Sequence, residues 1–516
     1  MDGFLGWVES LRPSSAAERG AGGFLHWACP LLAVAALCMG GGTRSGFLGD
    51  PVLQLLAIPV LAAALLDMAR EPPRQWPRAE IALVVCILLV PVLQVAPLPP
   101  GFWTMLPQFA PLLDAQKLIG LAQGWHGLSL HPDATALAAL SLILPAALFL
   151  GIIRLDAGGR RSVAVCVVAV AGISVFLGLA QVADNGQDSA LYFFEITNRG
   201  DSVGFFANRN HFAALMYVAV VLASVWAINA ILDLWKDGER AGPGPAVVLT
   251  ASLALMVTFS VAQIVARSRA GAGLAAVGWA GIALMLIQDR RNQRRGRSLL
   301  ALAGIGVTVL LFASQFGLGG LLERFDPIDS RDARLIAANA MIDKAPGYLP
   351  FGSGMATFRP VYAMIERRED LLANTYINQG HNDLLQIWLE AGYFGVGALA
   401  LFALCYVHRS FRVWWKSDGT TPDADLLLAR AAAFAILLLL AHSLVDYPLR
   451  TSAGMAMFAI CCALICKPVR MPPPGSGGSS HGRKESPRRS VGTPLVRRRN
   501  APQTPAIAPR RALSWS

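Results

Sequence analysis

The residues best suited to chemistry are His381, Asn382 and Asp383, which directly precede a long apolar run, and Glu390, which lies inside that run. On a helix that begins near Asn382, a polar stripe would join Asp383, Gln386 and Glu390, because residues three and four apart share a face. A carboxylate within a membrane helix is costly and usually faces a partner. We therefore expect Glu390 to pair with an arginine or a backbone donor. His381 lies outside the stripe, at the boundary with water, where it is a candidate general base as well as a candidate structural residue.

Two further clusters are suited to binding an anion. Arg267 and Arg269 flank Ser268 in a short turn, where a guanidinium can hold phosphate oxygens through two hydrogen bonds. The alternative is that these arginines extend to lipid headgroups. The second cluster consists of Asn208, Arg209, Asn210 and His211 at the start of an apolar run. Helix capping would explain one asparagine, and a helix N-terminus also favours anions, which makes Arg209 a second candidate.

The elements that position these residues are apolar runs of membrane-spanning length. The chain has 516 residues, of which 54% are hydrophobic and only 15% are charged, whereas soluble proteins carry about 25% charged residues. Apolar runs of spanning length number about twelve, which predicts an all-α polytopic membrane protein. The runs lie near Phe24–Gly40, Val52–Met68, Ala79–Ala96, Ala134–Ile153, Val163–Ala183, His211–Leu232, Ala246–Ala266, Gly271–Ile287, Leu299–Gly317, Leu384–Val407, Leu426–Val445 and Leu449–Cys466.

The distribution of basic residues predicts the orientation of these spans. Short loops at 70–78, 154–161 and 290–297 are rich in arginine, and all three lie on one side if the N-terminus is inside. We therefore expect cytoplasmic termini, a cytoplasmic segment 1–23 and a transmembrane domain 24–466. The histidine and arginine clusters then face the periplasm, together with a long, partly helical loop at 318–383.

The C-terminal segment 467–516 accounts for most of the net charge of +11. It contains 11 basic residues and one acidic residue, which leaves 33 basic and 32 acidic residues elsewhere. Its Pro-, Gly- and Ser-rich composition predicts a disordered tail. Attraction to anionic membrane lipids explains such a tail better than binding to nucleic acid does.

Motifs of other enzyme classes are missing from the sequence. The stretch GGGTRSG at Gly40–Gly46 lacks the lysine of a phosphate-binding loop, and no zinc signature is present. The eight cysteines lie in or beside apolar runs and have no metal-ligand spacing. We therefore expect neither a metal nor a cofactor.

Four blocks in order resemble those of the bacterial O-antigen ligase and O-antigen polymerase superfamily. They are GFFANRNHFAALM (Gly204–Met216), SRAG (Ser268–Gly271), SRDARLIAANAMIDKAP (Ser330–Pro346) with FGSGMATF (Phe351–Phe358), and GHNDLLQIWLEAGYFG (Gly380–Gly395). The resemblance covers about 204–395. It departs from the family at Leu335, where relatives often have an aromatic residue, and before His381, where relatives often have a second histidine.

The resemblance implies a GT-C-like membrane glycosyltransferase of the bacterial inner membrane that uses lipid-linked sugars. The donor would be a glycan on undecaprenyl diphosphate, transferred with inversion to an acceptor hydroxyl. His381 would be the base, and the diphosphate would be bound by Arg209, Arg269, Arg331 and Arg334. Arg331 matches the spacing of the family block better than Arg334 does. The supporting residues would be Asn208, Asn210, His211, Ser268, Asn382, Asp383 and Glu390.

The sequence does not decide the acceptor, and it leaves two classes of function to compare. A ligase would use lipid A–core as acceptor, and a polymerase would use another lipid-linked glycan. A membrane transporter of a small anion or of a lipid-linked saccharide is the alternative, but transporters usually place their polar groups near the middle of the membrane. Here most polar clusters gather at the outer face, which favours the enzyme.

Overall fold

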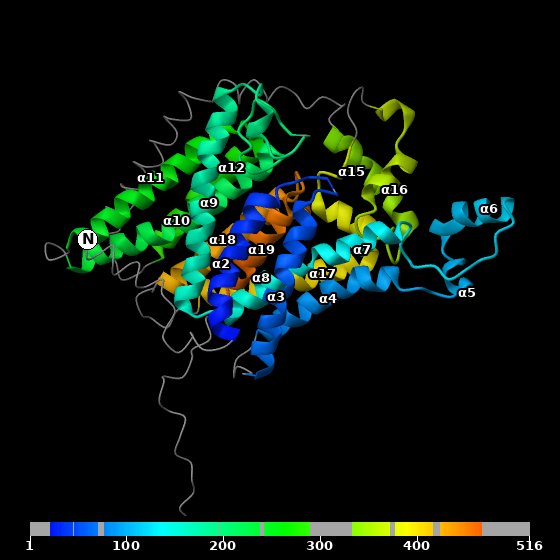
Figure 1. Ribbon diagram of the computed structural model, residues 1–516, viewed down its shortest axis with the longest axis horizontal. Coiled ribbons are helices and arrows are strands. Elements are labelled where there is room, and N and C mark those ends of the chain that lie inside the picture. Colours follow the sequence, from blue (N-terminus) through cyan, green and yellow to red (C-terminus); the bar gives the residue numbers. More distant parts are fainter. Residues whose placement is uncertain are drawn as a thin grey trace, which may run out of the picture. The chain divides into compact units, whose positions relative to one another are not determined.

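The computed structural model describes residues 21–44, 46–70, 77–195, 197–237, 242–288, 333–371, 377–415 and 424–466. Within these ranges the chain forms helices joined by loops, with two isolated β-bridges (Figure 1). The membrane-type helices are α2 (Ala21–Met39), α3 (Gly49–Arg70), α4 (Arg78–Val95), α7 (Pro132–Ser141), α8 (Ile143–Arg154), α9 (Ala157–Ala183), α10 (Arg209–Asp237), α11 (Pro243–Val265), α12 (Arg269–Ile287), α17 (Asp383–Trp415), α18 (Ala424–His442) and α19 (Ser452–Leu464).

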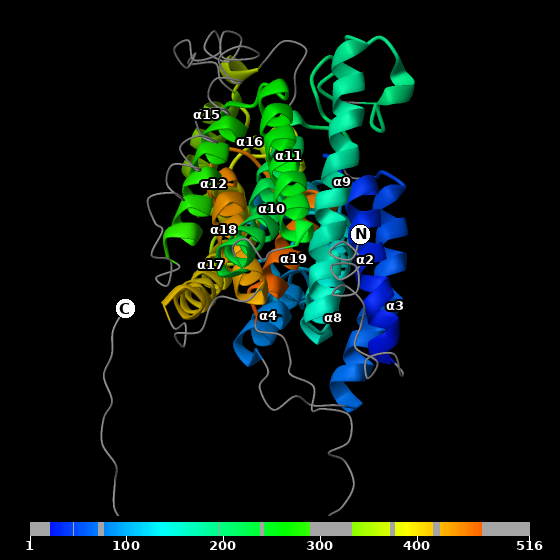
Figure 2. The same cartoon turned by 90° about the vertical axis from the view of Figure 1, so that its left-hand side faces the viewer.

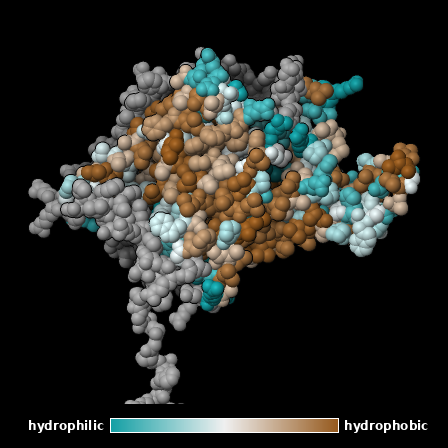
Figure 3. All heavy atoms as spheres, viewed as in Figure 1, coloured by the Kyte–Doolittle hydropathy of each residue, from teal (hydrophilic) through white to brown (hydrophobic). Residues whose placement is uncertain are grey.

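Nine spans in the described part of the chain are long and apolar enough to cross a membrane, with α7 and α8 together forming one of them. Two shorter apolar helices, at Gly23–Met39 and Ser452–Leu464, accompany them. The span expected at Leu299–Gly317 lies outside the described residues, so the count of twelve stays a prediction. Hydrophobic atoms cover the middle of the face in Figure 3, as a bilayer requires.

Helix α10 is the most buried of these spans, because its apolar residues surround it on all sides. It packs against α9, α11, α12 and α18, and Figure 2 shows these helices running alongside one another. Helices α3 and α4 instead expose large apolar side chains such as Leu55, Leu66 and Leu93. Those exposed side chains are suited to contact with lipid.

The segment expected to form a periplasmic loop is partly helical, as predicted. It contains α15 (Ala333–Lys344) and α16 (Phe358–Ile365), which pack with the first turns of α17 in a small core of their own around Met341, Phe358 and Leu389. Pro360 lies in the first turn of α16. Proline is tolerated there since first-turn N–H groups have no partner within the helix.

Helix α17 is two helical segments that meet at a sharp break, which the continuous apolar run did not predict. At the break, Gly392 has φ 54° and ψ −140°, a conformation that other residues rarely adopt. A Cβ on Gly392 would lie 2.3 Å from the oxygen of Pro350, and one on Gly352 would lie 2.4 Å from the backbone of Glu390. The glycines therefore let the loop before α16 dock on the break, where the nitrogen of Gly354 donates to the oxygen of Glu390 at 2.9 Å.

The other glycines in this part of α17 have different surroundings from those of Gly392. A Cβ on Gly395 would meet Ala391 and Ile387 of its own helix, and one on Gly397 would meet nothing within 4 Å. In contrast, Gly271 does allow a close approach, because its Cβ would lie 2.6 Å from Ala213 of α10.

Candidate active site

His381 lies in the loop before α17 and pairs with a carboxylate from the turn between α18 and α19. Its Nδ1 lies 3.1 Å from Oδ1 of Asp446. The His381 side chain is 20% exposed, whereas that of Asp446 is fully buried. The ring of His381 also packs edge-on against Tyr447, with centroids 4.8 Å apart. The structure thus holds the imidazole in place while leaving part of it open to solvent.

The electrostatics of Asp446 determine which nitrogen of His381 can act as a base. Burial alone would raise the pKa of Asp446, but the hydrogen bond from His381 and the neighbouring histidines outweigh burial and hold that pKa well below its ordinary value. An ionised carboxylate can only accept hydrogen bonds, so Nδ1 of His381 carries the proton. In the neutral imidazole, Nε2 is then the unprotonated nitrogen, which is the requirement for a general base.

Asp446 also joins the His381 loop to the two clusters from α10 and α12. Its second oxygen accepts a hydrogen bond from Nδ2 of Asn210. The oxygen of that Asn210 amide accepts from Oγ of Ser268 at 2.8 Å. Ser268 in turn caps α12 by accepting from the nitrogen of Gly271 at 3.0 Å. Residues far apart in sequence therefore form one hydrogen-bonded chain.

The remaining predicted polar residues cap helices or pack against an aromatic ring. Asn208 accepts from the nitrogen of Asn210 at 2.8 Å, as an N-terminal cap does. Asn382 caps α17 in the same way, accepting from the nitrogens of Leu384 and Leu385. His211 is buried with its ring edge-on to Tyr447, at a centroid distance of 5.1 Å.

The described members of the predicted diphosphate arginines lie at the start of α10, at the start of α12 and in α15. Arg209 begins α10 and its Nη1 donates to Asp201 at 2.5 Å, while Arg267 lies 3.9 Å from the same carboxylate. Arg269 is the first residue of α12 and is exposed. Arg334 approaches from α15, and its charge acts on the Tyr447 hydroxyl. Arg331 lies outside the described residues.

The polar stripe of α17 finds its partner in Arg450, which confirms the expectation for Glu390. Nη1 of Arg450 donates to Glu390 at 2.6 Å, and Nε donates to Asp383 at 3.1 Å. Burial disfavours the cation, but the two carboxylates outweigh it and raise the pKa of Arg450 above its usual value. Glu390 also accepts from Nε2 of Gln386 at 2.9 Å and from the nitrogen of Phe358 at 3.1 Å. The stripe therefore fixes α16 and the α18–α19 turn on α17.

The sequence analysis missed Asp446 and Asp201 as members of the site. Both carboxylates lie in segments that connect apolar runs, which is the signal that could have identified them. Their partners were beyond prediction, because Asp446 lies 65 positions from His381 in the sequence.

These features define a multi-pass helical membrane protein with a histidine–carboxylate pair and several arginines at one end of its helix bundle. Residues 246–401 match the model of the family described as O-antigen ligase. Over this segment, the match confirms the resemblance to the O-antigen ligase and polymerase superfamily that the sequence blocks indicated. The match includes Ser268, Arg269, Arg334, His381 and Glu390. No curated protein matches the chain.

Proposed function

We propose that the protein transfers a glycan from undecaprenyl diphosphate to an acceptor hydroxyl at the periplasmic face of the bacterial inner membrane. The observation that carries the proposal is the pairing of His381 with the ionised Asp446 inside the arginine-rich end of the bundle. The family match over 246–401 supports the same class of reaction. Both termini are cytoplasmic in this proposal, and the fold is GT-C-like.

In the proposed mechanism, Nε2 of His381 removes the proton from the acceptor hydroxyl as that oxygen attacks the anomeric carbon. Asp446 holds the imidazole in the required tautomer and stabilises the imidazolium that forms. The bond from the anomeric carbon to the diphosphate breaks, with inversion at the carbon. Base catalysis of this kind contributes about 10²–10⁴ in rate.

The leaving diphosphate needs stabilisation of its charge more than it needs a proton. Arg269, Arg209, Arg334 and Arg331 are the proposed donors, since guanidinium groups hold phosphate oxygens in pairs. No metal has a role in this proposal. The acceptor is either lipid A–core, which would make the protein a ligase, or a second lipid-linked glycan, which would make it a polymerase.

The test is reconstitution with purified protein in liposomes, a lipid-linked glycan donor, and each acceptor supplied separately. We expect a new glycoconjugate and free undecaprenyl diphosphate, at equal rates with and without a chelator. Loss of activity on chelation would refute the metal-free mechanism. Movement of the donor across the bilayer without any new glycosidic bond would refute the transferase and favour a transporter.

A further inference from the structure

An arm between α4 and α7, residues 97–131, carries none of the residues assigned to the candidate active site. It contains α5 (Pro100–Trp103), the short helix η1 (Pro107–Phe109) and α6 (Ala110–Leu118). Figure 1 shows α5 and α6 projecting sideways beyond the ends of α4 and α7. The tip of the arm, residues 118–125, has the sequence LIGLAQGW, and every residue in it is exposed.

The tip of the arm exposes large apolar side chains and contains no charge. Leu118 is 88% exposed and Trp125 is 68% exposed, and no Asp, Glu, Lys or Arg occurs in the tip. The two charged residues of the arm, Asp114 and Lys117, form an ion pair with each other at 3.3 Å. Exposed apolar surface of this kind marks a site of contact with a membrane or with a protein.

The tip is held by a well-packed base. The rings of Trp103, Phe109 and His126 pack together, with centroids 5.1–5.3 Å apart. Nε1 of Trp103 donates to the oxygen of Gly124 at 3.0 Å. The backbones of Leu98 and His126 pair in an antiparallel bridge. These contacts fix both ends of the tip, so the tip has a defined position relative to α4 and α7.

The base of the arm contacts α17 where the long apolar part of that helix begins. Phe102 packs against Phe351 with centroids 6.2 Å apart, and Phe351 stacks on Phe394 at 5.8 Å. From Tyr393 to Trp415, α17 extends for about 34 Å, slightly more than the roughly 30 Å of a hydrocarbon core. Tyr393 and Phe394 therefore lie at one boundary of the span, where aromatic residues are enriched. The arm leaves the bundle at this level.

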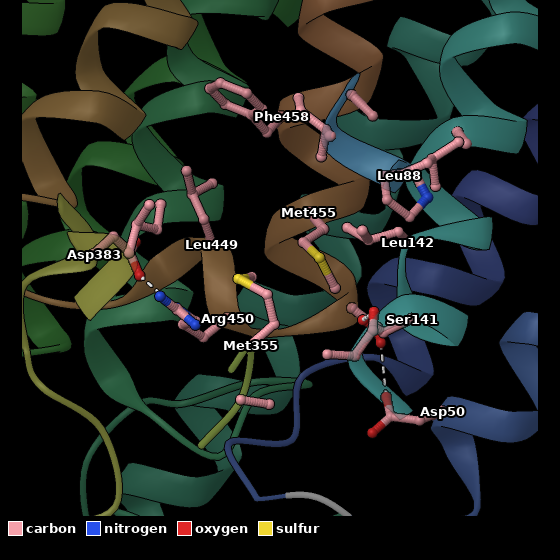
Figure 4. Close-up of a pocket in the computed structure, with 18 of the residues that line it drawn as sticks. Asp50, Leu88, Ser141, Leu142, Met355, Asp383, Leu449, Arg450, Met455 and Phe458 are labelled. Atoms are coloured by element: carbon pink, nitrogen blue, oxygen red, sulfur yellow. Dashed lines mark hydrogen bonds and ion pairs between the residues drawn. The ribbon is translucent and has the colours of Figure 1, made fainter. Parts of the chain in front are cut away.

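The lipid-facing surface of α4 leads directly into the arm. Leu88 of α4 lines an interior cavity (Figure 4), whereas Leu89 and Leu93 are exposed and suited to contact with lipid. Helix α4 ends at Val95, two residues before the arm begins. An arm that projects sideways from this surface, at the level of the membrane boundary, extends over lipid.

We propose that residues 118–125 insert among the lipid acyl chains of the leaflet nearest His381, so that the arm anchors this end of the protein at the membrane boundary. Acyl chains would cover Leu118 and Leu121, and Trp125 suits the boundary between acyl chains and headgroups. The paired Asp114 and Lys117 would lie among the headgroups.

One side chain connects the anchor to the loop that docks on the break in α17. Nε2 of Gln108 donates to the oxygens of Leu128 and Gly352, at 3.3 Å each. Gly352 packs on the backbone of Glu390, so insertion of the tip also fixes the height of this loop relative to the bilayer. The proposal does not rest on the proposed reaction.

The experiment measures labelling of a thiol in the tip by a charged, membrane-impermeant maleimide. Purified full-length Leu121→Cys is placed at one copy per nanodisc of phosphatidylethanolamine and phosphatidylglycerol. Gln187→Cys is the matched control, since Gln187 is exposed in the loop between α9 and α10. We expect Leu121→Cys to react roughly tenfold more slowly or less, because a thiol in apolar surroundings seldom ionises. The wild type gives the background of the native cysteines, and size-exclusion chromatography and thermal unfolding establish that both variants fold.

A photoactivatable lipid then identifies what shields the tip. In nanodiscs that contain phosphatidylcholine with a diazirine on its acyl chain, we expect adducts within residues 118–125 and none in the loop that carries Gln187. Equal labelling rates for Leu121→Cys and Gln187→Cys would overturn the proposal. Slow labelling without an acyl-chain adduct would show shielding by the protein itself and also overturn it. Slow labelling only in liposomes that hold several copies would identify a second copy of the chain as the partner, with the same consequence.

Discussion

The replacement Arg450→Met tests whether the buried charges at the start of α17 hold α17 and the α18–α19 turn together. In the structure one guanidinium neutralises two carboxylates, since Arg450 lies 3.1 Å from Asp383 and 2.6 Å from Glu390. The side chain of Asp383 is 3% exposed and that of Glu390 is fully buried. Removing Arg450 would leave both carboxylates buried without their cation.

Breaking a buried ion pair from one side costs about 3–5 kcal/mol, and 3 kcal/mol already shifts an equilibrium roughly a hundredfold. Neutralising the carboxylates as well, in Asp383→Asn/Glu390→Gln/Arg450→Met, should therefore recover part of the loss. Glu390→Gln alone should cost less, about 1.5–3 kcal/mol, because it weakens one charged hydrogen bond.

The assay is thermal unfolding of detergent-purified protein together with the yield of monodisperse protein. Arg412→Met is the matched control, because Arg412 is an exposed arginine in the last turn of α17, far from Asp383 and Glu390 along that helix. The expected order of stability is control, Glu390→Gln, triple variant, Arg450→Met. An Arg450→Met protein as stable as the control would refute the reasoning.

Three further predictions concern the anion site, the orientation and the break in α17. Arg269→Ala should lose most glycan transfer in the reconstituted assay, and Arg269→Lys should recover only part of it, because an ammonium cannot form the bidentate contact; full activity of Arg269→Lys would contradict this role. Reporter fusions at Gly296 and Gly347 should be active in the cytoplasm and the periplasm respectively, and the reverse pattern would overturn the topology. Gly392→Ala should lower the unfolding temperature, because its Cβ meets Pro350 and φ is positive, whereas Gly397→Ala, which meets nothing within 4 Å, should not.

The sequence predicted the helices well because apolar runs of spanning length have few alternative structures. It also predicted the kind of partner that Glu390 requires, since a carboxylate among apolar residues needs a donor. The identity of that partner was not predictable, because Arg450 is 60 positions away and only the packing of α17 against the last two helices brings it near. The break at Gly392 was missed for a different reason. A glycine in an apolar run is equally compatible with close helix packing, and only the docked loop at Pro350–Gly354 requires the positive φ.

Sequence reasoning treated His381 as a single residue, whereas the structure makes it half of a pair. The polar character of the segment Asp446–Arg450 was visible in the sequence. The sequence did not show that Asp446 and Arg450, four residues apart, pair with different parts of the site. Asp446 turns toward His381 and Arg450 turns toward the stripe of α17, because the short helix η7 (Pro448–Arg450) reverses the chain between them.

The rate of glycan transfer by His381→Ala, measured with purified lipid-linked donor and saturating acceptor, tests the central claim most directly. His381 lies outside the spans, so the variant should still insert. Its unfolding temperature should fall, because the fully buried Asp446 loses a partner, and the rate is therefore measured on protein that the unfolding assay shows to be folded. The account predicts a loss of about 10²–10⁴ in rate, with Asp446→Asn giving a smaller loss because it disturbs only the tautomer and the stabilisation of the imidazolium. A well-folded His381→Ala protein that transfers glycan at the wild-type rate would contradict the account.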